Sequence, residues 1–140
     1  MRSNQMEPWQ HRVTNILADA EICFDGDDFS GALEYFREAF HLIPEPKQQH
    51  AESTRVITGL GDCFYALGDF TKAKAAFDDV LLCPDGAGNP FVRLRRGQSS
   101  HRLGNQNDAI IDLTCAYLNG GENVFDGEDP MYIQLSLIHI

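Results

Sequence analysis

The sequence contains no long hydrophobic run: nowhere does it reach the roughly 20 consecutive apolar residues that a transmembrane helix needs. Its first ten residues, MRSNQMEPWQ, lack the apolar segment of a secretory signal peptide. Low-complexity tracts are absent as well, while 43% of the 140 residues are hydrophobic, which is enough for one domain with its own core. We therefore expect a single domain in the cytoplasm.

Positive charge is scarce. Eleven Lys and Arg residues stand against 21 Asp and Glu residues, which gives a formal net charge of −10 at pH 7. Such a charge repels nucleic acid and anionic membrane surfaces and favours a basic partner. We therefore expect neither nucleic acid nor membrane among the partners.

Cysteine pairs are also missing. None of the four cysteines forms a C-x-x-C pair, and the five histidines show no ligand spacing with them. Each cysteine falls within or beside a predicted helix, as small apolar residues of a reducing compartment do. The stretch DGDD at residues 25–28 has glycine at its second position, not at the sixth as in a calcium loop, and suits a tight turn with an N-cap. We expect no metal ion and no cofactor.

Catalytic motifs are missing too. The sequence holds no G-x-S-x-G, no H-E-x-x-H and no phosphate-binding loop. Ser99, Ser100 and His101 are neighbours, but helix residues one position apart do not face each other. We predict that the protein is not an enzyme. An enzyme or regulatory subunit whose site forms only in three dimensions remains an alternative.

What the sequence does contain is an internal repeat around Gly-Asp and Gly-Asn turns. The copies are GDDFSGALEYF at residues 26–36, LGDFTKAKAAF at residues 67–77 and GNQNDAIIDL at residues 104–113. Phe70, Ala73 and Phe77 are spaced three and four apart, so they share one helix face. Ala32, Ala73 and Ala109 mark the period at intervals of 41 and 36 residues. This pattern predicts a stack of helical hairpins.

These residues resemble the tetratricopeptide repeat family, whose repeat of about 34 residues follows the pattern W-x2-L-G-x2-Y…A-x3-F…P. The matching residues are Ala32, Phe36 and Pro44 in the first copy, Leu60, Gly61, Phe64, Ala73 and Phe77 in the middle copy, and Gly97, Ala109 and Leu113, more loosely, in the third. The resemblance implies an all-α fold, a right-handed superhelical stack of about three hairpins, or α-solenoid. It places repeats at about residues 13–44, 54–85 and 90–118.

The end of the chain departs from this pattern. Asp129 and Pro130 fit the N-cap and first turn of a partial capping helix that begins at about residue 129. The following hexamer, LSLIHI, has no helical polarity. We interpret residues 135–140 as a non-native tail and place the domain at residues 1–134.

Apolar spacing predicts six helices, at about residues 11–24, 29–43, 51–67, 70–82, 90–103 and 108–118. Ala20 and Gly61 are the small residues that let paired helices approach. Asp78 and Asp79 are expected on a solvent face. The helix at 90–103 carries four arginines, and Arg96 stands where the family has an apolar residue. An unpaired buried arginine is costly, so this helix must be half exposed or paired with acids.

By analogy with the family, the first helix of each hairpin lines the concave side of the stack. The implied groove residues are Leu17, Glu21, Phe24 and Asp25 from the first hairpin, Arg55, Thr58, Asp62 and Tyr65 from the second, and Phe91, Leu94, Gln98, His101 and Arg102 from the third. Three acids, Glu21, Asp25 and Asp62, should lie near one another, with Phe24 and Tyr65 beside them as anchors. We predict that a protein or peptide partner binds this groove.

A second resemblance suggests another role. The run PEPK…AES…GD…GDF…CP…GNPF…LR…GQ…LG, followed by AY…GEDP, is similar to a group of small bacterial tetratricopeptide proteins. Some of these are encoded near polymorphic toxins, which implies immunity proteins. The alternative function is therefore an acidic inhibitor that blocks a basic toxin. The oligomeric state is left open by the sequence.

Overall fold

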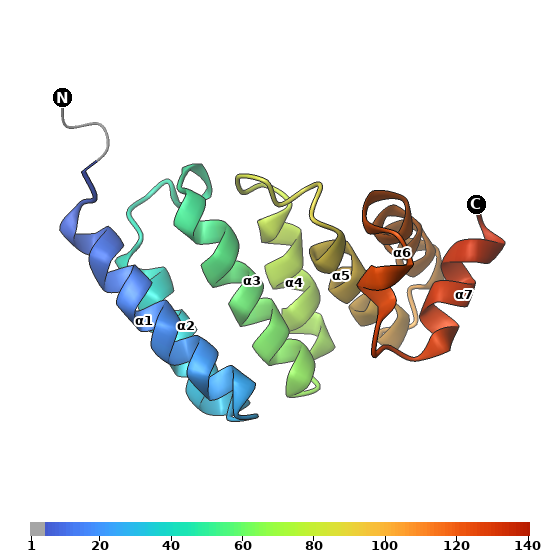
Figure 1. The fold of residues 1–140 in the computed structure, drawn as a ribbon, viewed down its shortest axis with the longest axis horizontal. Helices are drawn as coiled ribbons and strands as arrows, with labels where there is room; N and C mark the ends of the chain where they lie inside the picture. The colour runs from blue at the N-terminus through green and yellow to red at the C-terminus, as the bar shows by residue number, and fades with distance from the viewer. Residues whose placement is uncertain (1–4) are drawn as a thin grey trace.

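The computed structural model describes residues 5–140, and all regular secondary structure in that range is helical (Figure 1). The α-helices are α1 (Pro8–Asp25), α2 (Phe29–Leu42), α3 (Ala51–Ala66), α4 (Phe70–Val80), α5 (Pro90–Arg102), α6 (Gln106–Gly120) and α7 (Pro130–Ile138). Short 3-10 helices, η1 (Lys47–Gln49) and η2 (Glu122–Phe125), lie in the α2–α3 and α6–α7 connections. The all-α class is confirmed, and each helix expected from apolar spacing is present. Within residues 5–140, no helix combines the length and the apolarity needed to cross a bilayer.

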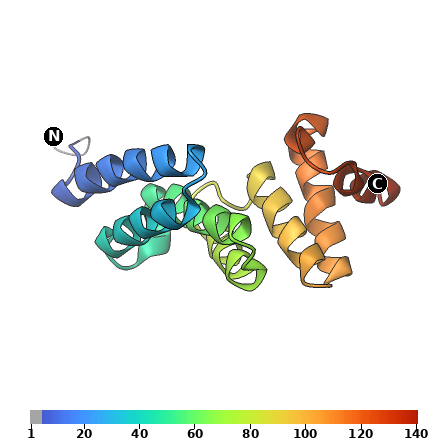
Figure 2. The ribbon, with the colours of Figure 1, turned by 90° about the horizontal axis from the view of Figure 1, so that it is seen from below.

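The helices follow one another along an elongated row, with α1 and α7 at its opposite ends (Figure 1). Helix α1 packs on α2, α3 on α4 and α5 on α6, and each of these pairs contacts the next through α2–α3 and α4–α5. Weaker contacts join the first helices of successive pairs, α1 to α3 and α3 to α5. The helix direction changes along the row, as the view from below shows (Figure 2).

One turn geometry recurs between the two helices of each pair. Asp27, Gly68 and Gly104 have φ angles of 62°, 82° and 85°, and they are separated by the same 41 and 36 residues as the sequence repeat. The residue that follows each of these three donates its backbone N–H to the carbonyl oxygen five positions before it. The N···O distances are 2.8 Å for Asp28, 2.9 Å for Asp69 and 2.8 Å for Asn105. This is the bond that closes a Schellman motif at a helix C-terminus. The sequence repeat is therefore also a repeat of backbone geometry.

The acidic residues of these turns cap the helices that follow. The Asp28 side chain accepts a hydrogen bond from the Gly31 N–H at 3.0 Å, and Asp69 accepts one from Lys72 at 3.1 Å. Asn89 caps α5 by accepting a hydrogen bond from the Phe91 N–H at 2.9 Å. The N-cap expected at Asp129 is present too, because Asp129 accepts one from the Met131 N–H at 2.9 Å. The prediction that residues 25–28 form a turn and an N-cap is confirmed.

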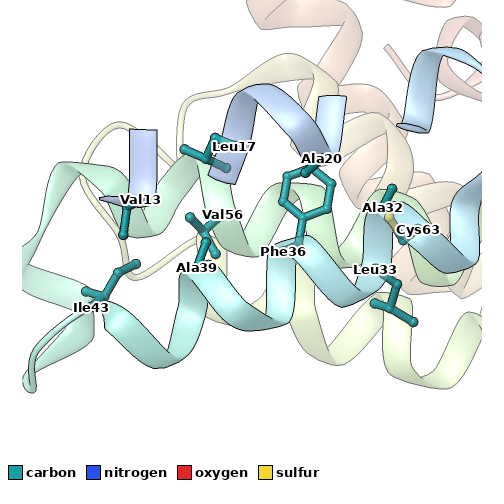
Figure 3. Close-up of a cluster of buried hydrophobic side chains, with 10 residues drawn as sticks. All are labelled: Val13, Leu17, Ala20, Ala32, Leu33, Phe36, Ala39, Ile43, Val56 and Cys63. Carbon is teal, nitrogen blue, oxygen red and sulfur yellow. The ribbon is translucent and has the colours of Figure 1, made fainter. Parts of the chain in front are cut away.

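Large side chains on the second helix of a pair pack against small residues on the first helix. A Cβ on Gly61 would lie 2.6 Å from Cε1 of Phe77, and one on Gly97 would lie 2.9 Å from Cγ of Leu113. In the first pair Ala20 lies over the ring of Phe36 (Figure 3). The close approach expected at Gly61 is confirmed, since the space that a side chain would need holds an aromatic ring.

Phe36 also joins the first pair to the second. Its ring leaves no room for a Cβ on Gly59 of α3, and it belongs to a buried cluster that contains residues of α1, α2 and α3 (Figure 3). Val56 and Cys63 of α3 belong to the same cluster. Successive pairs therefore share side chains and pack as a continuous core.

The arginines of α5 are paired with acids, as expected from the cost of burying them. Arg96 donates from Nη1 to both carboxylate oxygens of Asp112 on α6 at 2.9 Å, and from Nε to Asp78 on α4 at 2.7 Å. Arg93 donates to the same carboxylate of Asp112 at 3.1 Å. Asp78 also lies 3.4 Å from Nζ of Lys74. Asp79 is exposed and 44% of the Asp78 side chain is exposed, so both acids face solvent as expected. The sequence did not predict that Asp78 is also paired, because Arg96 reaches it from the next helix pair.

The first helix and the first long connection also differ from expectation. Helix α1 begins at Pro8, about one turn before the expected start, so Trp9 is helical and meets the His50 ring edge to face at 5.0 Å between centroids. The connection after α2 forms η1. There the Lys47 ammonium donates to the carbonyls of Phe40 and Ile43 at 2.7 and 2.6 Å and so caps the C-terminus of α2.

The C-terminal segment is more ordered than the sequence pattern indicates. Val124 and Phe125 of η2 are buried beside α6, and α7 continues through Ile138. Leu135 packs against this cluster and Ser136 is fully buried, so the first part of the hexamer LSLIHI belongs to a helix. The non-native origin of residues 135–140 stays a prediction, because helical structure does not show where a segment comes from.

Candidate partner-binding groove

A first hollow of about 450 Å³ lies between α1 and α3. Its lining comes from the first two helix pairs and from the connection before α5: Glu21, Phe24, Asp25, Phe36, Ala51, Thr54, Arg55, Thr58, Gly59, Asp62, Pro84, Asp85 and Asn89. The rings of Phe24 and Phe36 form apolar parts of its wall. The charged side chains come from α1, α3 and the α4–α5 connection.

A second hollow of about 500 Å³ lies between α3 and α5, beside the segment around η2. Its lining consists of Thr58, Asp62, Phe91, Leu94, Arg95, Asn123, Val124, Asp126 and Glu128. Thr58 and Asp62 belong to both linings, so the two hollows meet at the middle of α3. We call them together the groove.

Most of the residues predicted to face a groove line it. Glu21, Phe24, Asp25, Arg55, Thr58 and Asp62 line the first hollow, and Phe91 and Leu94 line the second, with Asp62 and Thr58 in both. The three acids expected to lie near one another, Glu21, Asp25 and Asp62, share the first hollow. Leu94 is buried and forms part of the floor of the second hollow, whereas Phe91 is 60% exposed.

Leu17 does not face the groove. Its side chain is 3% exposed and points into the cluster beneath α1, beside Val56 and Ala39 (Figure 3). The expected placement is corrected, because the family analogy assigned Leu17 to a face that the packing of α1 on α2 and α3 buries.

Tyr65 and Arg102 lie outside both hollows and bridge neighbouring helices. The Arg95 guanidinium carbon lies 5.0 Å from the Tyr65 ring centroid, and Phe70 meets that ring edge to face at 5.4 Å. Burial, together with the neighbouring Tyr132, raises the pKa of Tyr65 to about 12. Arg102 lies over Phe70 at 4.5 Å. Tyr65 is therefore covered by Arg95 and does not stand beside Phe24 as an open anchor.

Gln98 and His101 are covered by the C-terminal segment. Gln98 is fully buried, accepts a hydrogen bond from Arg95 at 2.7 Å and donates one to Glu128 at 2.7 Å. The His101 ring meets Tyr132 of α7 edge to face at 5.7 Å between centroids. Their expected exposure in the groove is corrected, since η2 and α7 fold over the second half of α5.

Several groove residues were not predicted. Thr54 lies one helical turn before Thr58 on the same face of α3, so its spacing of four was a usable signal. Pro84 and Asp85 enter from the α4–α5 connection, and Asp126 and Glu128 from the segment after η2. No helical periodicity reaches those segments, so only the folded chain brings them to the groove.

The groove has a surplus of negative charge. Its linings hold six carboxylates and two guanidiniums. Both guanidiniums are already paired: Nε of Arg55 donates to Glu21 at 2.7 Å, and Nη1 of Arg95 donates to Glu128 at 2.9 Å. The four carboxylates that form no ion pair within residues 5–140 are Asp25, Asp62, Asp85 and Asp126.

Asp62 differs from the other three because it is half-buried. Burial raises the pKa of Asp62 to about 6, and the attraction of the Arg95 guanidinium offsets this rise only in part. Raised carboxyl pKa values in a hollow mark a place where the charged form lacks a full complement of partners. In the part of the chain that the structure describes, no group of three or more His, Cys, Asp or Glu side chains is arranged to hold a metal ion.

Comparison with known proteins gives limited similarity. No protein-family model matches the chain. A segment of 74 residues, 52% of the chain, is 35% identical to the protein described as Protein CTR9 homolog from Arabidopsis thaliana. The match spans 6% of that protein, so the chain corresponds to a small part of a much longer relative.

Proposed function

We propose that this protein is a non-catalytic module that binds a protein or peptide partner in the groove, on an α-solenoid of three tetratricopeptide-like hairpins. The solenoid is supported by the turn that recurs at Asp27, Gly68 and Gly104 and by the recurring contact between a small residue and a large one. The 74-residue match to the CTR9 homolog has the length of about two repeats of 34 residues.

The single observation that carries the binding role is the joining of the two hollows at Thr58 and Asp62. A continuous groove along three first helices suits an extended segment that contacts several helices in turn. Its lining combines aromatic and aliphatic wall with unpaired carboxylates, the mixture of apolar contact and oriented polar groups found in recognition sites. No His, Cys or Lys side chain lines the groove, so no imidazole, thiol or amine is there to act as nucleophile or base.

The test is selection from a displayed library of random peptides on the immobilised protein. The Thr58→Trp variant fills the junction of the two hollows and should lose the enriched peptides. Thr71→Trp introduces the same bulk at an exposed position of α4 and should retain them. If both variants retain the enriched peptides equally, the peptides bind away from the groove.

An acidic inhibitor of a basic toxin is the second candidate function. The observation that favours it is the net charge of −10 together with four unpaired carboxylates in the groove. Under this hypothesis the partner is a folded basic protein encoded beside this gene. The purified neighbour should bind the wild type and the Thr71→Trp variant and be released by Thr58→Trp. A neighbouring product that is neither basic nor bound contradicts this candidate and leaves the peptide-binding role standing.

A further inference from the structure

We propose that the groove seats a lysine or arginine side chain of an extended partner segment against the carboxylate of Asp62. This inference rests on the proposed binding function and specifies the chemistry of the partner. Asp62 lies where the two hollows meet, so a side chain that reaches it belongs to a segment lying across the centre of α3. Its carboxylate forms no ion pair and no side-chain hydrogen bond with another residue in the described range 5–140.

The charges around Asp62 favour a cation as its partner. The charged residues that share the first hollow with Asp62 are Glu21 and Asp25 of α1, Arg55 of α3 itself and Asp85 of the α4–α5 connection. The charged groups across the second hollow are Arg95 of α5 and Asp126 and Glu128 after η2. Since each arginine is already bound to a glutamate, the unpaired charge in the groove is entirely negative. An acidic segment would be repelled along the full length of the groove.

The walls fit an amine or guanidinium on an aliphatic stem better than a bare ion. Phe24 and Phe36 line one side of Asp62, and Leu94 forms floor on the other. Long basic side chains bury their methylene groups on such surfaces while the charged end meets a carboxylate. A divalent cation would need several oxygens converging on one point, and in the described residues no such group is found.

Burial supplies a second, independent signature. The partly desolvated carboxyl of Asp62 has its pKa raised to about 6, and a cation seated beside it would favour the charged form. Binding would then release a proton, so affinity would increase as the pH rises through about 6 and level off above it. No histidine lines the groove, so no other side chain there ordinarily titrates in that window.

The experiment uses peptides selected from the random library on the full chain. Lysine or arginine should be enriched at one position of the selected peptides. A fluorescent peptide carrying that lysine, and its copy with norleucine in place of lysine, are then titrated by fluorescence anisotropy. At about pH 7.5 both the norleucine copy and the Asp62→Asn variant should bind at least about tenfold more weakly than the original pair. At about pH 5, where Asp62 is largely protonated, the Asp62→Asn variant should bind nearly as well as wild type.

The outcomes separate the two proposals. Selected peptides that are lost on Thr58→Trp but lack an enriched basic position overturn the lysine or arginine inference and leave groove binding standing. The same holds if Asp62→Asn binds the lysine peptide as tightly as wild type at both pH values. Peptides retained by Thr58→Trp, or the absence of any enriched peptide, contradict the binding function itself. Thermal melting of Asp62→Asn verifies that the variant is folded.

Discussion

Arg96 on α5 and Asp112 on α6 form a contact in which one guanidinium nitrogen donates to both carboxylate oxygens at 2.9 Å. The Asp112 side chain has no exposed surface, whereas 21% of the Arg96 side chain is exposed. Burial by itself would lower the pKa of Arg96, but hydrogen bonding to Asp78 and attraction by Asp112 raise it overall. The third helix pair therefore contains a buried carboxylate that pairs with two arginines, Arg93 and Arg96.

Asp112→Asn should lower the free energy of unfolding by about 2–3 kcal/mol, because Arg93 and Arg96 lose their charged acceptor while keeping partial access to water. Urea denaturation followed by circular dichroism measures the change. The control is Asp108→Asn, which makes the same substitution at an exposed position of α6. Equal denaturation midpoints for the two variants would contradict a stabilising role for the buried pair.

Gly61→Ala should destabilise the protein by about 1–3 kcal/mol, because the new methyl group meets the Phe77 ring and forces the α3–α4 pair apart. Gly88→Ala is the matched control, since a Cβ there has no atom within 4 Å. The melting temperatures of both variants measure the effect. If Gly61→Ala and Gly88→Ala have the same melting temperature, α3 and α4 accommodate the new methyl group without loss of stability.

Phe36→Ala should cost about 3–5 kcal/mol, because the ring fills space between Ala20 and Gly59 and is shared by two helix pairs. The control Tyr35→Ala removes a neighbouring aromatic side chain that is 36% exposed. Chemical denaturation of the two variants should therefore give clearly separated midpoints. Similar losses for both would show that the site at Phe36 collapses around the missing ring.

Asp62→Asn should stabilise the protein above about pH 6 by about 1–3 kcal/mol. The folded chain holds the Asp62 proton up to about pH 6, whereas an unfolded chain releases it near its ordinary value of 3.8. The folded state therefore binds more protons between these values, and the contribution of Asp62 to stability falls as the pH rises through that window. Asparagine does not titrate, so the stability of the Asp62→Asn variant does not fall for this reason as the pH rises.

Thermal melting at several pH values measures this dependence. The difference between Asp62→Asn and wild type should be small near pH 4, grow up to about pH 6 and then stay constant. Asp25→Asn serves as a control, since Asp25 is an exposed acid of the same groove. A pH-independent difference would show that Asp62 titrates normally in the folded chain.

Asp25→Asn combined with Asp126→Asn should lower the association rate of a selected lysine peptide about twofold to fivefold at low salt, because exposed carboxylates steer a cationic ligand toward the groove. Raising the salt concentration should shrink this difference through screening. Surface-plasmon kinetics gives the rates. Glu34→Gln with Glu38→Gln removes the same charge from exposed positions of α2 and should change the rate less. Identical rates for the two double variants would place the docking site elsewhere.

The sequence predicted the features that depend on local pattern. Spacings of three and four identified the helices, and Asp28 and Asn89 were recognisable as caps because capping needs only neighbouring residues. The pairing of Arg96 with acids followed from the cost of burying it alone, although its partners Asp78 and Asp112 were not identified. These inferences succeed because each depends on a short stretch of chain or on one strong energetic term.

The groove was predicted only in its first-helix residues. Asp85 and Glu128 reach it from irregular segments, whose paths are set by packing and carry no periodic signal. Gln98 and His101 were misplaced for the same reason: the segment that covers them follows a different helix in the chain. The burial that raises the pKa of Asp62 also requires three helices to be placed together, which no single stretch encodes.

Because each helix packs mainly on its neighbours along the chain, protection of backbone amides from hydrogen exchange should grade from the ends toward the middle. Helix α3 is covered by α2, α4 and parts of α1 and α5, so its amides should open last, whereas α1 and α7 lack a neighbour on one side among the described helices. Thr58 and Asp62 therefore belong to the slowest-exchanging segment. A partner that binds there meets a preformed surface.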